Sequence, residues 1–294
     1  MSQRSRPAAV AVIAMMTLAR ASRPVSAQVP SLTPPVVFPA AADSEIPRDD
    51  VGRAIRRGLA LVTATRDSLP GYVGNSLRCV SCHPDEGRRQ NAMPWVGVYG
   101  RFPQYRSRSG SVILIEDRIN DCFERSMNGT ALPTDGRDMR DIIAYMAFLS
   151  RGIPGGATVP GQGLPKLSIT RGESAAGAAV FHAKCVRCHG ADGQGTPVAP
   201  PLWGPESFNI GAGMARVRTA AAFIRYNMPF DRPATLSDQE AFDVATYVTS
   251  RPRPDFVGKE FDWPRGDPPP DVAYETLAAK RKVDSLAPKP KHSH

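Results

Sequence analysis

The sequence predicts an all-α fold made of two similar halves in tandem. The same short cysteine pattern occurs at Cys79–His83 and again 106 residues later at Cys185–His189. In both halves a later segment, Asp138–Ser150 or Ser237–Ser250, carries apolar residues at the spacing of one helix face. The chain has 294 residues, 41% hydrophobic and 22% charged, enough for about two domains. This composition excludes a coiled coil, a polytopic membrane protein and wholesale disorder.

The first 27 residues are predicted to be a signal peptide. A basic start precedes an apolar run from Ala8 to Ala19, and small residues at Val25–Ala27 suit a cleavage site. The run is shorter than the roughly 20 residues that span a bilayer, so we expect cleavage rather than anchoring. The alternative is an uncleaved N-terminal anchor. Cleavage predicts a periplasmic protein without a stable membrane span, and it lowers the formal net charge from +9 to +5 because four arginines are removed.

Each repeated pattern is a CxxCH motif. In an exported chain this motif is typical of c-type haem, because two thiols one turn apart form thioethers with the haem vinyls and the next imidazole ligates the iron. Zinc, a redox-active pair and disulfides are the alternatives, but the two pairs lie too far apart for a compact zinc ribbon. We therefore expect two covalently attached haem c groups. The haem propionates offset the basic charge of the chain, so this charge is no reason to expect a nucleic-acid partner. The predicted attachment residues are Cys79, Cys82, His83, Cys185, Cys188 and His189.

The second iron ligand of each haem is predicted from equal spacing. Met228 follows His189 by 39 residues, and Cys122 follows His83 by the same number. A methionine thioether raises the haem potential, as suits an electron carrier. The first half has a cysteine in that position, outside both motifs. The predicted iron ligands are thus His83 with Cys122 and His189 with Met228.

Each half is also predicted to place a helix before its motif. These helices cover about residues 51–66 and the alanine-rich residues 172–184. Ser237 and Glu240 form a capping box at the start of the second closing helix.

Glycine and proline mark the connections between these parts. They are dense between residues 152 and 166, and Pro268–Pro270 excludes regular helix near the C-terminus. The boundaries that follow are a signal peptide (1–27), an extended N-terminal segment (28–48), a first class I-type cytochrome c domain (49–151), a linker (152–166), a second such domain (167–252) and a Pro-rich, basic, extended tail (253–294).

Cys122 leaves three interpretations open. In the first, Cys122 is a buried core cysteine and Met127 ligates the iron. In the second, the Cys122 thiolate ligates the iron only to lower the haem potential. In the third, the Cys122 sulfur reacts with a sulfur substrate. If residues 111–129 are helical in their second half, Arg118, Cys122 and Ser126 share one face. A cation and a hydroxyl there would favour a thiolate and offer donors to an oxyanion. Arg106, Arg108 and Arg118 surround this segment, and each binds either an anion or a haem propionate.

Three strings of the first half resemble the dihaem thiosulfate dehydrogenases: Ala92–Gly97, Phe102–Arg108 and Arg118–Gly129. The similarity covers about residues 70–250, and Asn-Asp-Cys-Phe-x-Arg-Ser-Met-Asn-Gly is its most specific part. It implies that His83 and Cys122 ligate the catalytic haem and that His189 and Met228 ligate the electron-transfer haem. It also implies a substrate pocket that contains Arg108 and Arg118, with Ser126 beside them.

The resemblance further implies a reaction. Two thiosulfates are joined into tetrathionate with release of two electrons, or the reverse. Cys122 would leave the iron, take up one thiosulfate sulfur covalently and be attacked by the second thiosulfate, while arginines offset the repulsion. Electrons would pass through both haems to a soluble cytochrome c or similar acceptor. Two alternatives are a dihaem electron carrier without substrate chemistry and a Sox-type haem enzyme that acts on a carrier-protein cysteine.

Overall fold

The computed structural model describes residues 40–169 and 171–286. The predicted signal peptide and the outermost parts of both predicted extensions, residues 28–39 and 287–294, lie outside the described residues. The first half contains η1 (Asp43–Glu45), α1 (Asp50–Thr63), α2 (Thr65–Ser68), α3 (Cys79–Cys82), α4 (Pro84–Gly87), η2 (Tyr99–Arg101), β1 (Gln104–Arg106), β2 (Ser111–Ile113), α5 (Ile115–Asp121), the π-helical segment η3 (Cys122–Ser126) and α6 (Arg137–Leu149). The remainder contains α7 (Ser174–Lys184), α8 (Val186–His189), η4 (Gly213–Ala215), α9 (Val217–Asn227), α10 (Asp238–Thr249), η5 (Lys259–Phe261) and α11 (Leu277–Leu286).

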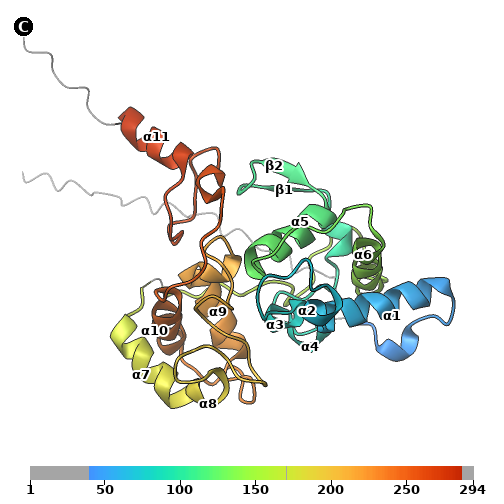
Figure 1. Cartoon of the computed structure of the whole chain (residues 1–294), viewed down its shortest axis with the longest axis horizontal. Helices are drawn as coiled ribbons and strands as arrows, with labels where there is room; N and C mark the ends of the chain where they lie inside the picture. The colour runs from blue at the N-terminus through green and yellow to red at the C-terminus, as the bar shows by residue number, and fades with distance from the viewer. Residues whose placement is uncertain (1–39, 170, 287–294) are drawn as a thin grey trace, which may run out of the picture. The chain divides into compact units, whose positions relative to one another are not determined.

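In both halves the first and last helices cross at a glycine. Helix α1 packs against α6, and α7 packs against α10 (Figure 1). A Cβ on Gly58 of α1 would lie 2.0 Å from the backbone oxygen of Asp141, and a Cβ on Gly177 of α7 would lie 2.0 Å from the backbone oxygen of Asp243. Only glycine allows such close contact between two helix backbones. The four helices predicted from periodicity are therefore present, and they meet in the same way in each half.

Each half contains a contact between the rings of one tryptophan and one tyrosine. The rings of Trp95 and Tyr145 are 6.1 Å apart and nearly perpendicular, and those of Trp203 and Tyr247 are 5.9 Å apart in the same arrangement. These edge-to-face contacts stabilise the core beyond simple burial. The repeat extends from the CxxCH motifs into the packing of the core.

The capping box predicted for α10 is confirmed. The Ser237 hydroxyl accepts a hydrogen bond from the backbone N–H of Glu240, and the Glu240 carboxylate accepts one from the backbone N–H of Ser237. These bonds satisfy two backbone donors that the start of a helix otherwise leaves free.

The all-α expectation is wrong at one place. Strands β1 and β2 form an antiparallel hairpin in which Tyr105 lies opposite Val112. Each strand has three residues, too few for an alternating pattern to stand out in the sequence. The apolar start of residues 111–129 therefore forms strand β2, and helix α5 begins only at Ile115.

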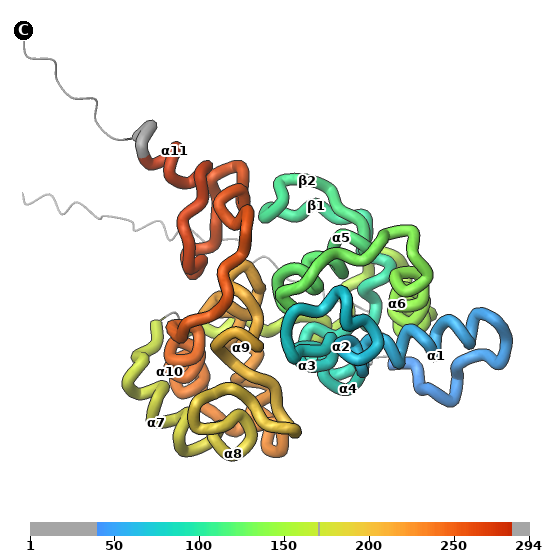
Figure 2. Tube along the Cα trace, in the orientation of Figure 1, coloured from blue at the N-terminus to red at the C-terminus, as the bar shows by residue number. Residues whose placement is uncertain are grey.

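The expectation of an extended C-terminal tail is also wrong in part. After Pro268–Pro270, which are not helical, residues Leu277–Leu286 form α11. Figure 2 traces this segment in red beyond α10. Its stretch of Leu, Ala, Lys and Arg contains neither Gly nor Pro, so helix propensity outweighs the Pro-rich character of the surroundings. Within the described residues, no helix is both long and apolar enough to cross a bilayer.

Buried asparagines join the two halves, which belong to one compact unit. Asn75 donates from its amide to the backbone oxygen of Ser207 at 3.0 Å, and Asn209 donates to the backbone oxygen of Glu124 at 2.8 Å. Both asparagines are 1% exposed. Because a buried amide without a partner is costly, these bonds specify how the halves meet.

The predicted linker contains no helix or strand, and part of it is bound to the first half. The Gln162 amide donates to the backbone oxygen of Val96 at 2.9 Å, and the backbone oxygen of Gly161 accepts from the N–H of Asn91 at 2.8 Å. The polypeptide between the halves is therefore ordered by hydrogen bonds rather than by secondary structure.

Candidate active site

The two motif histidines are oriented in the same way. Nδ1 of His83 lies 2.7 Å from the backbone oxygen of Met93, and Nδ1 of His189 lies 2.8 Å from the backbone oxygen of Pro200. A carbonyl only accepts hydrogen bonds, so each Nδ1 carries the hydrogen and each Nε2 keeps its lone pair. Burial lowers the pKa of His83 to about 4, which keeps its ring neutral. This is the usual arrangement of a histidine that ligates a metal through Nε2.

The motif cysteines are free thiols on single helical turns. Cys79 and Cys82 are the first and last residues of α3. Burial raises the pKa of both thiols to about 12, and the pKa of Cys185 to about 11. Among the described residues, no group of three or more His, Cys, Asp or Glu side chains gathers in a form that could hold a metal ion. Two thiols followed by an oriented imidazole fit a covalently attached haem in each half.

Cys122 and Arg118 lie close to the first motif. The Cys122 sulfur adds to the rise in the pKa values of Cys79 and Cys82, after burial, and the Arg118 charge adds to the lowering of the His83 pKa. These electrostatic effects require proximity. The structure thus brings together two side chains that lie some 40 residues beyond the motif in sequence.

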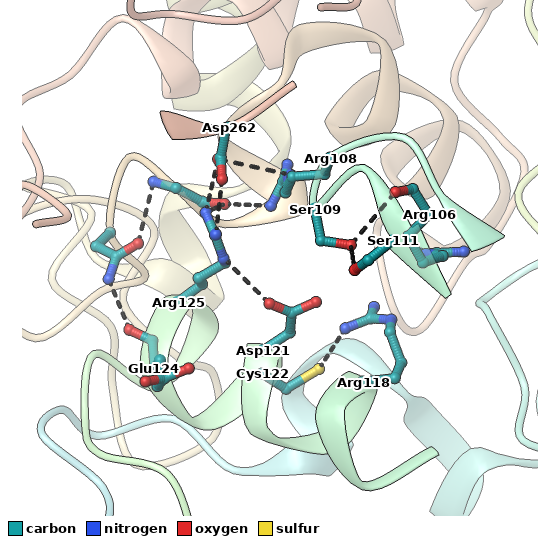
Figure 3. A network of polar contacts seen from close by, with 12 residues as sticks. Arg106, Arg108, Ser109, Ser111, Arg118, Asp121, Cys122, Glu124, Arg125 and Asp262 are labelled. Carbon is teal, nitrogen blue, oxygen red and sulfur yellow. Dashed lines mark hydrogen bonds and ion pairs between the residues drawn. The ribbon is translucent and has the colours of Figure 1, made fainter. Parts of the chain in front are cut away.

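The Arg118 guanidinium contacts the Cys122 sulfur directly. Nη1 of Arg118 donates to Sγ of Cys122 at 3.1 Å (Figure 3). The negative charge of the sulfur raises the pKa of Arg118. Cys122 is half-buried at the junction of α5 and η3. A cation at hydrogen-bond distance stabilises the thiolate form of this sulfur, which is the nucleophilic form.

Arg118, Cys122 and Ser126 are predicted to share one helix face. This is correct for Arg118 and Cys122, whereas the position of Ser126 is shifted. Arg118 and Cys122 are one α-helical turn apart, but η3 is π-helical, with the N–H of Met127 bonded to the Cys122 oxygen at 2.8 Å. The wider turn alters the angular spacing from that of an α-helix. Ser126 still lines the cavity described below.

The remaining candidate iron ligands differ in their surroundings. Met127 is 2% exposed and packs in the hydrophobic core of the first half. Met228 directly follows α9 and is half-buried, one turn after Ile224, which packs in the same cluster as Cys185. An ion pair of 2.7 Å between Arg187, inside the second motif, and Asp231 joins the motif to this region. Ligation by Met228 stays a prediction that this neighbourhood supports.

An arginine-lined cavity of about 720 Å³ opens beside α5 and η3. This volume falls within the range of about 300–1,000 Å³ that is usual for small-molecule sites. The predicted pocket residues Arg108, Arg118 and Ser126 all line it. Sequence reasoning missed two further cavity arginines, Arg125 and Arg216. The Arg125 position lies inside the most specific string of the first half, so that string was the available signal.

The β-hairpin carries two of the cavity arginines. Arg106 ends β1, and Arg108 lies in the turn that leads to β2. The Arg108 guanidinium donates to the backbone oxygen of Gly211 at 2.6 Å and lies 4.9 Å from the ring centre of Trp263. The backbone N–H of Trp263 donates to the Arg108 oxygen at 2.8 Å. Arg108 is therefore held by both the second half and the C-terminal segment.

The C-terminal segment contributes a buried carboxylate that holds Arg125, one of the residues that line the cavity. Asp262 accepts two hydrogen bonds from Arg125, at 2.8 and 2.9 Å (Figure 3). It accepts a third from the Tyr274 hydroxyl at 2.6 Å. Burial raises the pKa of Tyr274, so this hydroxyl stays protonated and donates. No motif pointed to these residues, because they come from the part expected to be an extended tail.

Two protein families match the two halves. Residues 72–154 match the family described as "SoxA/TsdA, cytochrome c domain", and residues 172–248 match "Cytochrome C oxidase, cbb3-type, subunit III". Both halves are therefore cytochrome c domains, which confirms two covalently attached haem c groups and decides against zinc and disulfides.

Several proteins that are all called thiosulfate dehydrogenase are similar to this chain over most of its length. A thiosulfate dehydrogenase of Allochromatium vinosum is 48% identical over 234 residues, which cover 76% of this chain and 87% of that protein. One of Psychrobacter arcticus is 45% identical over 237 residues, 78% of this chain and 72% of that protein. The solved structure of a thiosulfate dehydrogenase from Marichromatium purpuratum, in its as-isolated form, matches 81% of this chain with a TM-score of 0.74 at 35% identity, and this chain spans 55% of that longer one.

Proposed function

This chain belongs to the thiosulfate dehydrogenase family, and on that premise we propose that it joins two thiosulfate ions into tetrathionate at Cys122. The observation that carries the proposal is the 3.1 Å contact between Cys122 and Arg118 beside an arginine-lined cavity. A reactive sulfur, a cation that stabilises its thiolate and a cavity for oxyanions are the parts that this reaction needs. The reverse reaction uses the same groups.

The proposed iron ligands are His83 with Cys122 in the first domain and His189 with Met228 in the second. The Nδ1 hydrogen bonds of both histidines, the position of Cys122 near the first motif and that of Met228 near the second support this assignment. When bound, the haems supply one-electron acceptors for the two electrons that the reaction releases.

The sulfur chemistry divides into two steps at Cys122. In the first, a bond forms between the Cys122 thiolate and the outer sulfur of one thiosulfate, with loss of two electrons, and gives Cys122–S–S–SO₃⁻. In the second, the outer sulfur of another thiosulfate attacks the sulfur bonded to Sγ. The S–S bond to Cys122 breaks, its electron pair returns to the thiolate, and tetrathionate leaves. No proton is gained or lost, and the division avoids bringing two dianions together in a single oxidative step.

The arginines have separate roles in this scheme. Arg118, in contact with Sγ, stabilises Cys122 as the attacking and then the leaving thiolate. Arg108 and Ser126, on the cavity wall, bind sulfonate oxygens and offset the repulsion between the two substrates. Their donors are held in place before the substrate arrives, because Arg108 is bonded to Gly211 and stacked on Trp263.

The acceptor and the compartment complete the proposal. The predicted signal peptide, residues 1–27, supports export to the periplasm, and a soluble cytochrome c or similar carrier there would take the electrons. The proposed domain limits remain 49–151 and 167–252, joined by residues 152–166.

The test is turnover by the purified, haem-loaded chain with thiosulfate and an artificial one-electron acceptor, with tetrathionate as the measured product. We expect wild-type protein to form tetrathionate alone and Cys122→Ala to lose at least about a hundredfold in kcat, because the covalent step is removed. The electron paramagnetic resonance signal of a thiolate-ligated low-spin haem should disappear in the same variant.

Met127→Leu is the matched control, since it keeps the volume of a buried side chain. We expect it to retain the thiolate signal and turnover. An unchanged spectrum in Cys122→Ala would reject the ligand assignment. Turnover that appears only when a carrier protein is added would identify a Sox-type enzyme, and no turnover at all would identify an electron carrier.

A further inference from the structure

The cavity arginines differ in how their charge is balanced. Arg125 is paired with Asp262, and it also contacts Asp121 at 3.3 Å. Arg108 lies 3.8 Å from the Asp262 carboxylate. Arg106, Arg118 and Arg216 form no ion pair with any carboxylate in residues 40–169 and 171–286. The cavity is lined by five arginines and by three acidic residues, Asp117, Asp121 and Glu124, so its wall still has a surplus of positive charge.

Arg216 has the least satisfied guanidinium of this group. It lies at the N-terminal boundary of α9, in the second domain, and lines the cavity. Its Nε is buried and has no hydrogen-bond partner among the described residues. A buried donor without an acceptor costs free energy, and an oxyanion in the cavity would supply the acceptor.

Arg216 and Arg108 act on each other electrostatically. Burial and the charge of Arg125 lower the pKa of Arg108, Tyr274 and Asp262 oppose this change, and the charge of Arg216 adds a smaller lowering. Two guanidiniums held near one another across the two domains repel each other unless an anion lies between them. The backbone N–H of Arg218, at the start of α9, already donates to the Asp271 carboxylate at 2.9 Å, so this donor does not serve an anion in the cavity.

We propose that Arg216 and Arg108 form a second oxyanion subsite, which binds the sulfonate of the thiosulfate that attacks the Cys122 adduct. The inference rests on the proposed function and extends it. Arg118 serves the sulfur of Cys122 and the first substrate, while Arg216 brings a residue of the electron-transfer domain into substrate binding. The active site is then complete only when both domains are in contact.

The test compares Arg216→Gln and Arg216→Lys with Arg218→Gln in the haem-loaded full chain. Arg218 is exposed on the same helix, so its loss removes the same charge two residues away from the cavity. We expect Arg216→Gln to raise the KM for thiosulfate about tenfold or more, since a hydrogen bond to a charged group is lost. Arg216→Lys should recover part of the loss, and Arg218→Gln should match the wild type.

Two further measurements separate this subsite from other roles. The covalent adduct of Cys122 with the first thiosulfate, followed by mass spectrometry, should still form in Arg216→Gln, and the haem reduction potentials should stay at wild-type values. A shifted potential with an unchanged KM would show that Arg216 pairs with a haem propionate, and loss of the adduct would place it in the first step. Either result overturns the proposal while leaving wild-type tetrathionate formation intact. Failure of the proposed function would instead abolish tetrathionate formation in the wild type.

Discussion

At the scale of single residues, the chemistry depends on side chains whose charge is stabilised by a specific partner. The Cys122 sulfur has the Arg118 guanidinium, and Arg125 has the Asp262 carboxylate. The first pair places the sulfur of the proposed reaction next to Arg118, which lines the cavity, whereas the second consumes the charge of an arginine that would otherwise attract substrate. The same residue type therefore serves binding in one place and structure in another.

Removal of the Asp262 charge should destabilise the protein. In Asp262→Asn the buried Arg125 guanidinium loses its bidentate partner, and breaking such a pair costs about 3–5 kcal/mol. We expect a clear fall in Tm for the haem-loaded protein. Tyr274→Phe removes only one neutral donor and should cost about 1 kcal/mol. Equal losses in the two variants would contradict the ion-pair argument.

At the scale of elements, each domain is defined by a helix crossing and a motif turn. The crossing brings the first and last helices together at a glycine, and the intervening chain carries the motif histidine and the proposed second ligand. The β-hairpin is specific to the first domain, where it carries Arg106 and Arg108 to the cavity. In the proposed mechanism, the hairpin contributes to anion binding through these arginines.

The glycine at the crossing should tolerate no side chain. In Gly58→Ala, the new Cβ would overlap the backbone oxygen of Asp141, so the two helices must separate. Overpacking of this kind costs about 1–3 kcal/mol, and more where backbone must move. Thermal unfolding of the haem-loaded protein should show a large fall in Tm. Gly71→Ala is the control, because a Cβ there meets nothing within 4 Å. A similar Tm in both variants would show that the crossing is not so tight.

At the scale of the whole molecule, the proposed active site draws on three distant parts of the chain. The first domain supplies Cys122 and Arg118, the second supplies Arg216, and the C-terminal segment supplies Asp262 and Trp263. Buried asparagines fasten the domains together, so the cavity keeps its shape. In the proposed mechanism, substrate binding and electron transfer are therefore linked through the domain contact.

Two truncations should separate the roles of the C-terminal segment. Removal of residues 277–294 deletes α11 and leaves the Asp262 carboxylate with both of its partners, Arg125 and Tyr274. We expect near-normal turnover and KM. Removal of residues 259–294 also deletes Asp262 and Trp263. It should lower Tm, as Asp262→Asn does, and raise the KM for thiosulfate because Arg108 loses the ring of Trp263 on which it stacks. Identical behaviour of the two proteins in steady-state assays would show that Asp262 and Trp263 have no part in the cavity.

The sequence by itself determined the parts of this protein that depend on short-range spacing. The CxxCH motifs, the periodic helices and the Ser237–Glu240 cap are local patterns, since thioether attachment, helix periodicity and capping each involve residues within a few positions of one another. The similar placement of Cys122 and Met228 followed from the repeat of these patterns. The proximity of Arg118 to Cys122 followed from helical spacing.

Only the tertiary structure decided which distant side chains balance one another. The pairing of Arg125 with Asp262, the stacking of Arg108 on Trp263 and the unpaired Nε of Arg216 depend on chain segments that lie far apart in sequence. Burial and charge pairing are properties of the assembled surface, and a linear pattern does not contain them. The short hairpin and α11 likewise escaped the sequence, because three-residue strands show no period and helix formers within a Pro-rich tail are masked by their surroundings.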